Sequence, residues 1–142
     1  KGLKMMDWEE VKTIGSEDLF EIGAHTVTHR KLHKLEIEEA REEIITSKNV
    51  LEEKLNKPIK IFAYPYGRYN QSVLDIMGKN DFKFVFSTKP GHLRKNFDKL
   101  KIFRFGVDNY RSKYFPDIFK LGYELYWRLI WAIKKCYENF SF

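Results

Sequence analysis

The clearest periodic pattern in the sequence predicts a long amphipathic helix that begins near residue 36. Apolar or small residues recur there three or four positions apart, which is the spacing of one helix face. They are Ile37, Ala40, Ile44, Ser47, Leu51 and Leu55. Pro58 marks the limit of this helix, because proline cannot continue one.

Shorter apolar runs predict strands at residues 19–24, 59–63 and 82–87, with a fourth plausible strand at 103–107. Residues 71–77 predict a short helix between the second and third strands. Because predicted strands alternate with helices through short connections, the order favours βα units and a parallel sheet or part of a barrel. The sequence therefore predicts an α/β fold.

The first helix is predicted from a capping signal. Asp7 is a good N-cap, and Glu10 stands where its side chain can reach back to close a capping box. Trp8, Val11 and Ile14 would form a short buried face. Gly15 and the serine after it would end the helix.

The C-terminal region carries two neighbouring apolar stripes at helical spacing, which predict a long aromatic-rich helix. One stripe contains Ile118, Leu121, Leu125, Leu129, Ala132, Ile133 and Cys136, and the other contains Phe119, Tyr123, Trp127 and Ile130. So wide an apolar surface needs a cover. It could pack on the protein's own core, join a second subunit in a homo-oligomer, or lie on a membrane surface through residues 115–142.

Composition limits the function classes. The 142 residues, 43% of them hydrophobic, suffice for one core. A single cysteine excludes an intrachain disulfide and a multi-thiolate metal site, so a metal would rest on imidazole and carboxylate. The net charge of +6 is spread along the chain without a nucleic-acid-binding motif, and we expect no nucleic-acid partner. Because the chain begins with Lys1 rather than methionine, we expect a piece of a longer protein.

His25 and His29 are the candidate metal ligands. At positions i and i+4 they would share one face of a helical turn and could converge on one divalent metal. The spacing by itself is weak evidence, but the pair follows a predicted strand, and Thr26 and Thr28 could orient the ligands. His33 continues the spacing in a basic run and is interpreted as a solvated surface residue.

A second polar segment follows the predicted strand at 59–63. Proline and glycine surround a tyrosine at residues 64–67, which is typical of a fixed turn at a strand end. In a parallel sheet this places polar atoms at the same carboxyl edge as the histidines.

The two segments, residues 20–29 and 62–70, together resemble the polysaccharide deacetylase family with its NodB-homology domain, carbohydrate esterase family 4. The resemblance covers roughly residues 5–110. It implies a partial (β/α)7 deacetylase barrel with parallel strands, followed here by the aromatic-rich C-terminal helix. The implied partition is an incomplete deacetylase domain over residues 1–112 and a helical extension over 113–142.

The resemblance implies a metal-dependent hydrolase that removes N-acetyl groups from an amino-sugar polymer or glycan. By position, His25 and His29 would bind a divalent metal, zinc by default, with cobalt, nickel or iron also compatible. Tyr66 would be catalytic, since its backbone N–H would donate to the oxyanion. The implied substrate-binding residues are Tyr64, Pro65, Tyr66, Gly67 and Arg104.

One family motif has no counterpart in this sequence. The strand end that supplies the catalytic base and the metal-binding aspartate should precede the histidines, yet no Asp-Asp pair lies in the 24 residues before His25. We therefore expect this chain to be the C-terminal portion of such an enzyme, nearly inactive alone, with its metal site incomplete.

Two other functions stay open at the level of sequence. One is a degenerate, non-catalytic domain that binds carbohydrate or metal, and the other is a membrane-surface or subunit-interaction module. The family favours the cell envelope or an extracytoplasmic location, but the sequence itself does not indicate a compartment.

Overall fold

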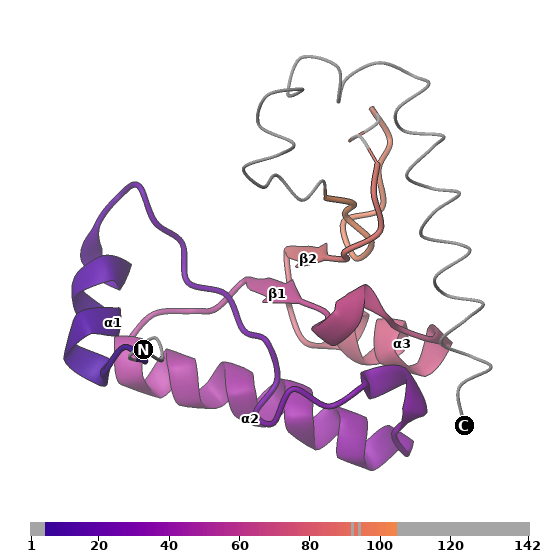
Figure 1. Cartoon of the computed structure of the whole chain (residues 1–142), viewed down its shortest axis with the longest axis horizontal. Helices are drawn as coiled ribbons and strands as arrows, with labels where there is room; N and C mark the ends of the chain where they lie inside the picture. The colour runs from indigo at the N-terminus through magenta and orange to yellow at the C-terminus, as the bar shows by residue number, and fades with distance from the viewer. Residues whose placement is uncertain (1–4, 92, 94, 105–142) are drawn as a thin grey trace, which may run out of the picture.

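The computed structural model describes residues 5–91, 93 and 95–104, in which helices alternate with short strands (Figure 1). In chain order the elements are α1 (Trp8–Ser16), η1 (Leu32–Lys34), α2 (Ile37–Leu55), β1 (Ile61–Ala63), η2 (Pro65–Gly67), α3 (Gln71–Lys79) and β2 (Phe84–Phe86). Within this part of the chain, no helix has the length and apolar character needed to cross a membrane. The predicted C-terminal helix and the 112/113 boundary lie outside the described residues.

The strands form a parallel sheet, as the sequence predicts. β1 and β2 pair in parallel with Phe62 opposite Val85. Isolated parallel bridges extend the pairing on both sides, from Ala24 to Phe62 and from Phe86 to Ile102. Four chain segments therefore lie side by side and end at one edge, which confirms the α/β architecture with parallel strands.

The predicted strand at residues 19–24 forms only at its last residue. The Ala24 N–H donates to the Ile61 carbonyl at 2.9 Å, and the Ala24 carbonyl accepts from the Ala63 N–H at 3.0 Å. Before it, Leu19 is 92% exposed, and the Phe20 N–H closes a turn on the carbonyl of Glu17. This turn keeps the start of the predicted strand away from β1.

Gly23 lets this segment approach β1. A Cβ there would lie 3.0 Å from the Ile61 side chain and 3.1 Å from its carbonyl oxygen. Such contacts are tighter than most real Cβ contacts, so glycine favours the close backbone approach here.

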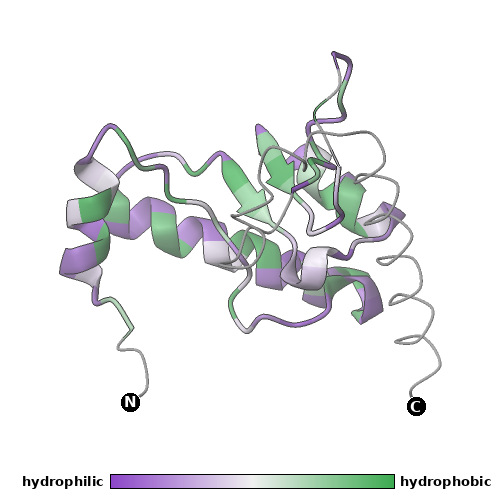
Figure 2. Ribbon diagram, turned by 45° about the horizontal axis from the view of Figure 1, so that its top comes forward, coloured by the Kyte–Doolittle hydropathy of each residue, from purple (hydrophilic) through white to green (hydrophobic). Residues whose placement is uncertain are grey.

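The core lies between α2, α3 and the sheet, and α2 is amphipathic as predicted. Ala40, Ile44 and Ser47 are buried on its inner face. Figure 2 shows the contrast between the hydrophobic strands and the alternating hydropathy along α2. Ile37 at the start of the predicted stripe is instead 47% exposed. The helix ends at Leu55, and the C-cap residue Asn56 is left-handed with a φ of 50°, two residues before Pro58.

The capping box at the first helix is confirmed, but its predicted buried face is not. The Asp7 side chain accepts from the Glu10 N–H at 2.9 Å, and the Glu10 side chain accepts from the Asp7 N–H at 2.9 Å. No residue of α1 is buried, and Trp8 is 42% exposed. α1 packs mainly against the end of α2 (Figure 1), so its apolar face is only partly covered.

Candidate functional site

The candidate site lies where the four parallel segments end. The loop of residues 25–29, here called the histidine loop, follows Ala24, and the turn of residues 64–67, here called the tyrosine turn, follows β1. Ser87 and Thr88 follow β2, and Arg104 stands two residues after the bridge at Ile102. The carboxyl edge of a parallel sheet is where α/β folds place ligands.

The structure brings the two histidines together with the tyrosine. The ring centres of His25 and His29 are 4.9 Å apart, with an angle of 65° between the planes. The His29 and Tyr66 rings are 4.8 Å apart. Two imidazoles that share one metal hold their ring centres about 5 Å apart, because each nitrogen lies about 2 Å from the metal and each ring centre about 1 Å further. The separation of the pair therefore suits a shared metal.

The pair converges without the helical turn that its spacing predicted. The histidine loop contains no helix, and two of its non-glycine residues are left-handed, Thr26 with φ 69° and His29 with φ 59°. The Thr26 hydroxyl oxygen accepts the His29 N–H at 3.1 Å. The loop is thus a tight irregular turn rather than the helical turn that the spacing predicted. The two histidine rings nevertheless lie next to each other.

The His25 ring is oriented by the strand next to it. Its Nδ1 lies 2.7 Å from the carbonyl oxygen of Ala63. Because a carbonyl can only accept, Nδ1 carries the proton and Nε2 of the neutral ring keeps its lone pair. Histidines that bind metals are commonly fixed by this kind of bond on the opposite nitrogen.

Glu43 of α2 holds the histidine loop, a role that the sequence analysis missed. Its Oε2 accepts the N–H groups of Val27 and Thr28, each at 2.9 Å, and its Oε1 accepts the Thr28 hydroxyl. Burial alone would raise the pKa of Glu43, yet these hydrogen bonds and the charge of Arg30 together bring that pKa below its ordinary value. The signal in the sequence is a glutamate on the inner face of α2, between Ala40 and Ser47.

The tyrosine turn is held by two residues that directly follow β2. Tyr66 has a left-handed φ of 57° and Gly67 a φ of 66°. The Ser87 hydroxyl donates to the Gly67 carbonyl at 3.0 Å, and the Thr88 hydroxyl donates to the Tyr66 carbonyl at 3.1 Å. These two residues were also missed, although a Ser-Thr pair directly after an apolar strand is a usable signal.

Tyr66 is the exposed member of the turn. It is 50% exposed, and Lys31 lies with its Nζ 5.4 Å from the ring centre. Among the backbone hydrogen bonds outside helices and strands in the described part of the chain, none is donated by the Tyr66 N–H.

The other residues of the turn are placed differently from the substrate contacts expected of them. Tyr64 is fully buried and donates its hydroxyl to the Leu100 carbonyl at 3.0 Å, and burial raises the pKa of this phenol strongly. Pro65 and Gly67 are also buried. Their side of the turn packs into the core, because the turn is covered by the residues after β2.

Arg104 is exposed at the same edge of the sheet. Its Nε donates to the Ser87 carbonyl at 3.0 Å, and its guanidinium carbon lies 5.8 Å from the Phe86 ring centre. The side chain is thereby tied to the end of β2. His33 lies in η1 and is half-buried, which corrects its interpretation as a solvated residue.

The described residues include the two histidines that the sequence analysis expects to bind a metal. No group of three or more His, Cys, Asp or Glu side chains among them could hold a metal ion. The two imidazoles fit a shared metal by their separation and by the fixed tautomer of His25. A carboxylate is the donor type that would complete the set.

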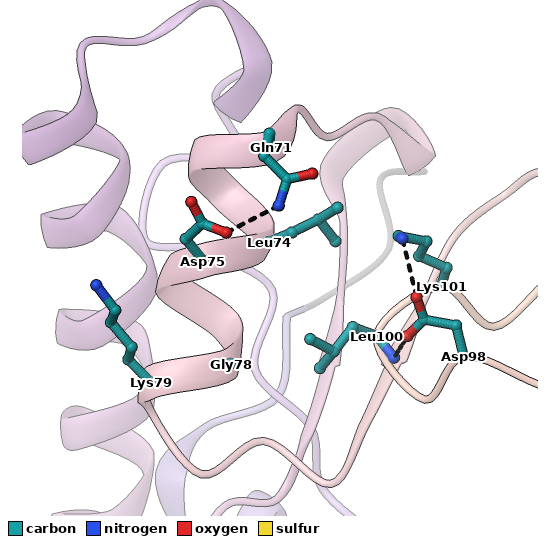
Figure 3. A pocket seen from close by; sticks show the side chains of 8 residues that line it. All are labelled: Gln71, Leu74, Asp75, Gly78, Lys79, Asp98, Leu100 and Lys101. Atoms are coloured by element: carbon teal, nitrogen blue, oxygen red, sulfur yellow. Dashed lines mark hydrogen bonds and ion pairs between the residues drawn. The ribbon is translucent and has the colours of Figure 1, made fainter.

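A pocket elsewhere on the molecule is separate from this site (Figure 3). It is an open depression of about 430 Å³ between α3 and residues 98–101. Its polar rim is paired internally, with Gln71 donating to Asp75 at 2.8 Å and Lys101 lying 2.9 Å from Asp98. The hydrogen bond from Lys101 and the backbone N–H of Leu100 keep the pKa of Asp98 below its ordinary value. This rim presents no converging set of groups to a ligand.

The solved structures with similar folds include deacetylases. One is the Streptococcus pyogenes deacetylase PplD in complex with acetate, at 25% identity and a TM-score of 0.68, covering 72% of this chain and 45% of that one. Another is BC0361, a polysaccharide deacetylase from Bacillus cereus, at 31% identity and a TM-score of 0.62, covering 70% and 31%. The chain thus spans less than half the length of either structure.

A mutant of BA3943, a CE4 family pseudoenzyme, is similar in fold alone, at 23% identity and a TM-score of 0.52, with 58% of this chain and 30% of that one covered. No curated protein matches the sequence. The model of the polysaccharide deacetylase family matches residues 2–85, which include both the histidine loop and the tyrosine turn. This chain belongs to the polysaccharide deacetylase family.

Proposed function

We propose that this chain carries the histidine ligands and the oxyanion-binding turn of a metal-dependent deacetylase acting on N-acetyl groups of an amino-sugar glycan. The observation that supports it most is the convergence of His25, His29 and Tyr66, with both ring pairs within 5 Å: 4.9 Å between the histidines and 4.8 Å from His29 to Tyr66. Three groups from two strand ends meet at one point.

The chain's own residues would divide the work as follows. His25 and His29 would hold a divalent metal, most readily zinc, which when bound supplies an acidified water and polarises an acetyl carbonyl. The Tyr66 N–H would donate to the oxygen that becomes negative as the carbonyl is attacked. The exposed Tyr66 ring offers an apolar face to a sugar, and Lys31 stands beside it.

We further propose that the base and the acidic metal ligand come from polypeptide outside these 142 residues. A carboxylate base contributes roughly 10²–10⁴-fold to such a hydrolysis. The sheet edge formed by the segment that ends at Ala24 offers a place for another strand. Ala24 uses both of its backbone groups on β1, and Phe20 in the same segment is 56% exposed. A parallel strand added there would bring its carboxyl end next to His25.

Zinc titration by calorimetry tests the histidine pair. The 142-residue chain is expected to bind one zinc, and His25→Ala or His29→Ala is expected to weaken binding by about tenfold or more. His33→Gln is the matched control and should leave the affinity unchanged. Equal zinc binding by all four proteins would contradict the assignment of the pair.

Acetate release from N-acetylglucosamine oligomers tests the origin of the carboxylates. The chain alone is expected to be nearly inactive, and activity should rise when the Asp-Asp segment of a full-length deacetylase is fused ahead of Lys1. Turnover by the unfused chain near the rate of an intact enzyme would contradict this part. Glycan binding without turnover in the fused protein would instead favour a non-catalytic carbohydrate-binding domain.

A further inference from the structure

The residues between the two histidines are held by a carboxylate from outside the loop, Glu43 of α2. We propose that Glu43 is a positioning residue, whose carboxylate fixes the backbone of residues 27 and 28 and thereby sets the distance and orientation of His25 and His29. The effect on metal binding rests on the proposed function, whereas the fixing of the loop stands without it.

Both oxygens of Glu43 are used on the histidine loop. Oε2 accepts two consecutive backbone N–H groups, from Val27 and Thr28, each at 2.9 Å. Oε1 accepts the Thr28 hydroxyl. Glu43 is only 8% exposed, although the loop that it holds is a surface segment in which Val27 is 55% exposed. A buried carboxylate is therefore directed at an exposed loop rather than at the core.

The loop needs an external support because its backbone is unfavourable. Thr26 and His29 both have left-handed φ values, 69° and 59°, and such residues cost on the order of 1 kcal/mol or more each unless their surroundings hold them. Inside the loop, the bond from the His29 N–H to the Thr26 hydroxyl supplies one constraint. The three bonds to Glu43 lie between these two strained positions and connect them to a rigid helix.

The charge on Glu43 suits this role. An ionised carboxylate only accepts hydrogen bonds, and it makes stronger ones than a neutral group does. Arg30, which directly follows the loop, pairs with Glu39 on the exposed side of α2 at 3.3 Å. Glu43 is thus left to the donors of Val27 and Thr28.

The test compares Glu43→Leu, which keeps the size of the side chain but removes both acceptors, with Glu43→Gln. Leucine suits the inner face of α2, so the variant is expected to fold. An amide oxygen can still accept the two N–H groups while the amide nitrogen donates to the Thr28 hydroxyl, so Gln should restore most of the effect. Glu39→Leu is the matched control, one turn away on the same helix.

Two readouts are measured on the 142-residue chain. Hydrogen exchange of the Val27 and Thr28 amides is expected to accelerate at least about tenfold in Glu43→Leu, with little change in the amides of β1. Zinc affinity is expected to fall roughly 10–100-fold. Glu43→Gln and Glu39→Leu should each stay within about threefold of the native affinity.

Each outcome decides the proposal. Unchanged amide exchange in Glu43→Leu, or faster exchange with unchanged zinc affinity, would overturn it. Acceleration spread equally over β1 and α3 would assign Glu43 a general structural role and would also overturn it. If the native chain binds no zinc, the proposed function fails, and amide exchange alone then decides whether Glu43 fixes the loop.

Discussion

The histidine loop and the tyrosine turn occupy equivalent places at the ends of adjacent parallel segments, yet they are held in opposite ways. The loop is held through its N–H groups, which converge on the carboxylate of Glu43. The turn is held through its carbonyls, which accept hydroxyls from Ser87 and Thr88. One region depends on a single charged side chain, whereas the other depends on several neutral groups and on burial.

This difference indicates how each region should respond to change. The turn is packed between the core and the residues after β2, so it is rigid and a steric change there disturbs the whole fold. The backbone of the loop is largely exposed and is held to the rest of the fold mainly by Glu43, so its histidines can be displaced while the fold survives. The following predictions measure this contrast.

The largest effect is expected for Gly67→Ala in the tyrosine turn. A Cβ at this position, with its φ of 66°, would collide with the backbone nitrogen and hydroxyl of Thr88. The free energy of unfolding should fall by about 3 kcal/mol or more in urea denaturation. Gly78→Ala is the control, since a Cβ there meets only Leu100 at 3.9 Å. Equal stabilities of the two variants would show that the turn is not sterically fixed.

Ser87→Ala is expected to have an intermediate effect. Ser87 is 1% exposed. Its hydroxyl donates to the Gly67 carbonyl and accepts the Lys89 N–H at 3.0 Å. Its loss should lower the free energy of unfolding by about 1–2 kcal/mol. Ser47→Ala provides a buried serine on α2 for comparison and should cost less, because its hydroxyl bonds a carbonyl of its own helix. The reverse order would contradict the view that Ser87 holds the turn.

A smaller, pH-dependent effect is expected at the histidine loop. The pKa of Glu43 lies below its ordinary value in the folded chain, so ionised Glu43 stabilises the fold at neutral pH, and this contribution is lost as the pH falls below about 4. Amide exchange at Val27 and Thr28, corrected for intrinsic rates, should therefore lose protection on acidification. Glu43→Gln should lack this pH dependence. An acid profile of amide exchange identical in Glu43→Gln and the native chain would contradict the prediction.

The smallest effect is expected for Thr88→Val. Its hydroxyl bond to the Tyr66 carbonyl lies at an exposed position, where water can replace it. The free energy of unfolding should change by no more than about 0.5 kcal/mol in urea denaturation. A loss as large as that of Ser87→Ala would mean that the turn depends on this exposed bond as well.

Much of the fold could be predicted from the sequence, because its signals are local. The inner face of α2, the capping box at Asp7 and the parallel strand order follow from periodicity and from residue types. The strand before Ala24 was overestimated, because apolar residues such as Leu19 do not reveal whether a neighbouring strand exists to pair with them. Trp8 was wrongly assigned to a buried face, because helical spacing does not reveal how much of that face another element covers.

The residues that meet at the carboxyl edge of the sheet were predicted better than their geometry. The histidines and Tyr66 were singled out from two motifs. The left-handed backbone that brings their rings together was not predicted, because its support comes from Glu43, which is 16 residues from Val27 in sequence and adjacent in space. Tyr64 was expected at the substrate and lies in the core, because the direction of a side chain at a turn depends on what covers the turn.

The central claim is that His25 and His29 bind one metal, and that His25 binds it through Nε2 because its Nδ1 is held by the Ala63 carbonyl. Nitrogen-15 NMR of the histidine rings during zinc titration tests this most directly. We predict that zinc shifts the Nε2 resonance of His25 while its Nδ1 stays protonated on the Ala63 carbonyl, and that a ring nitrogen of His29 shifts at the same zinc equivalent. Zinc that leaves both rings unshifted, or that binds His25 through Nδ1, would contradict the account.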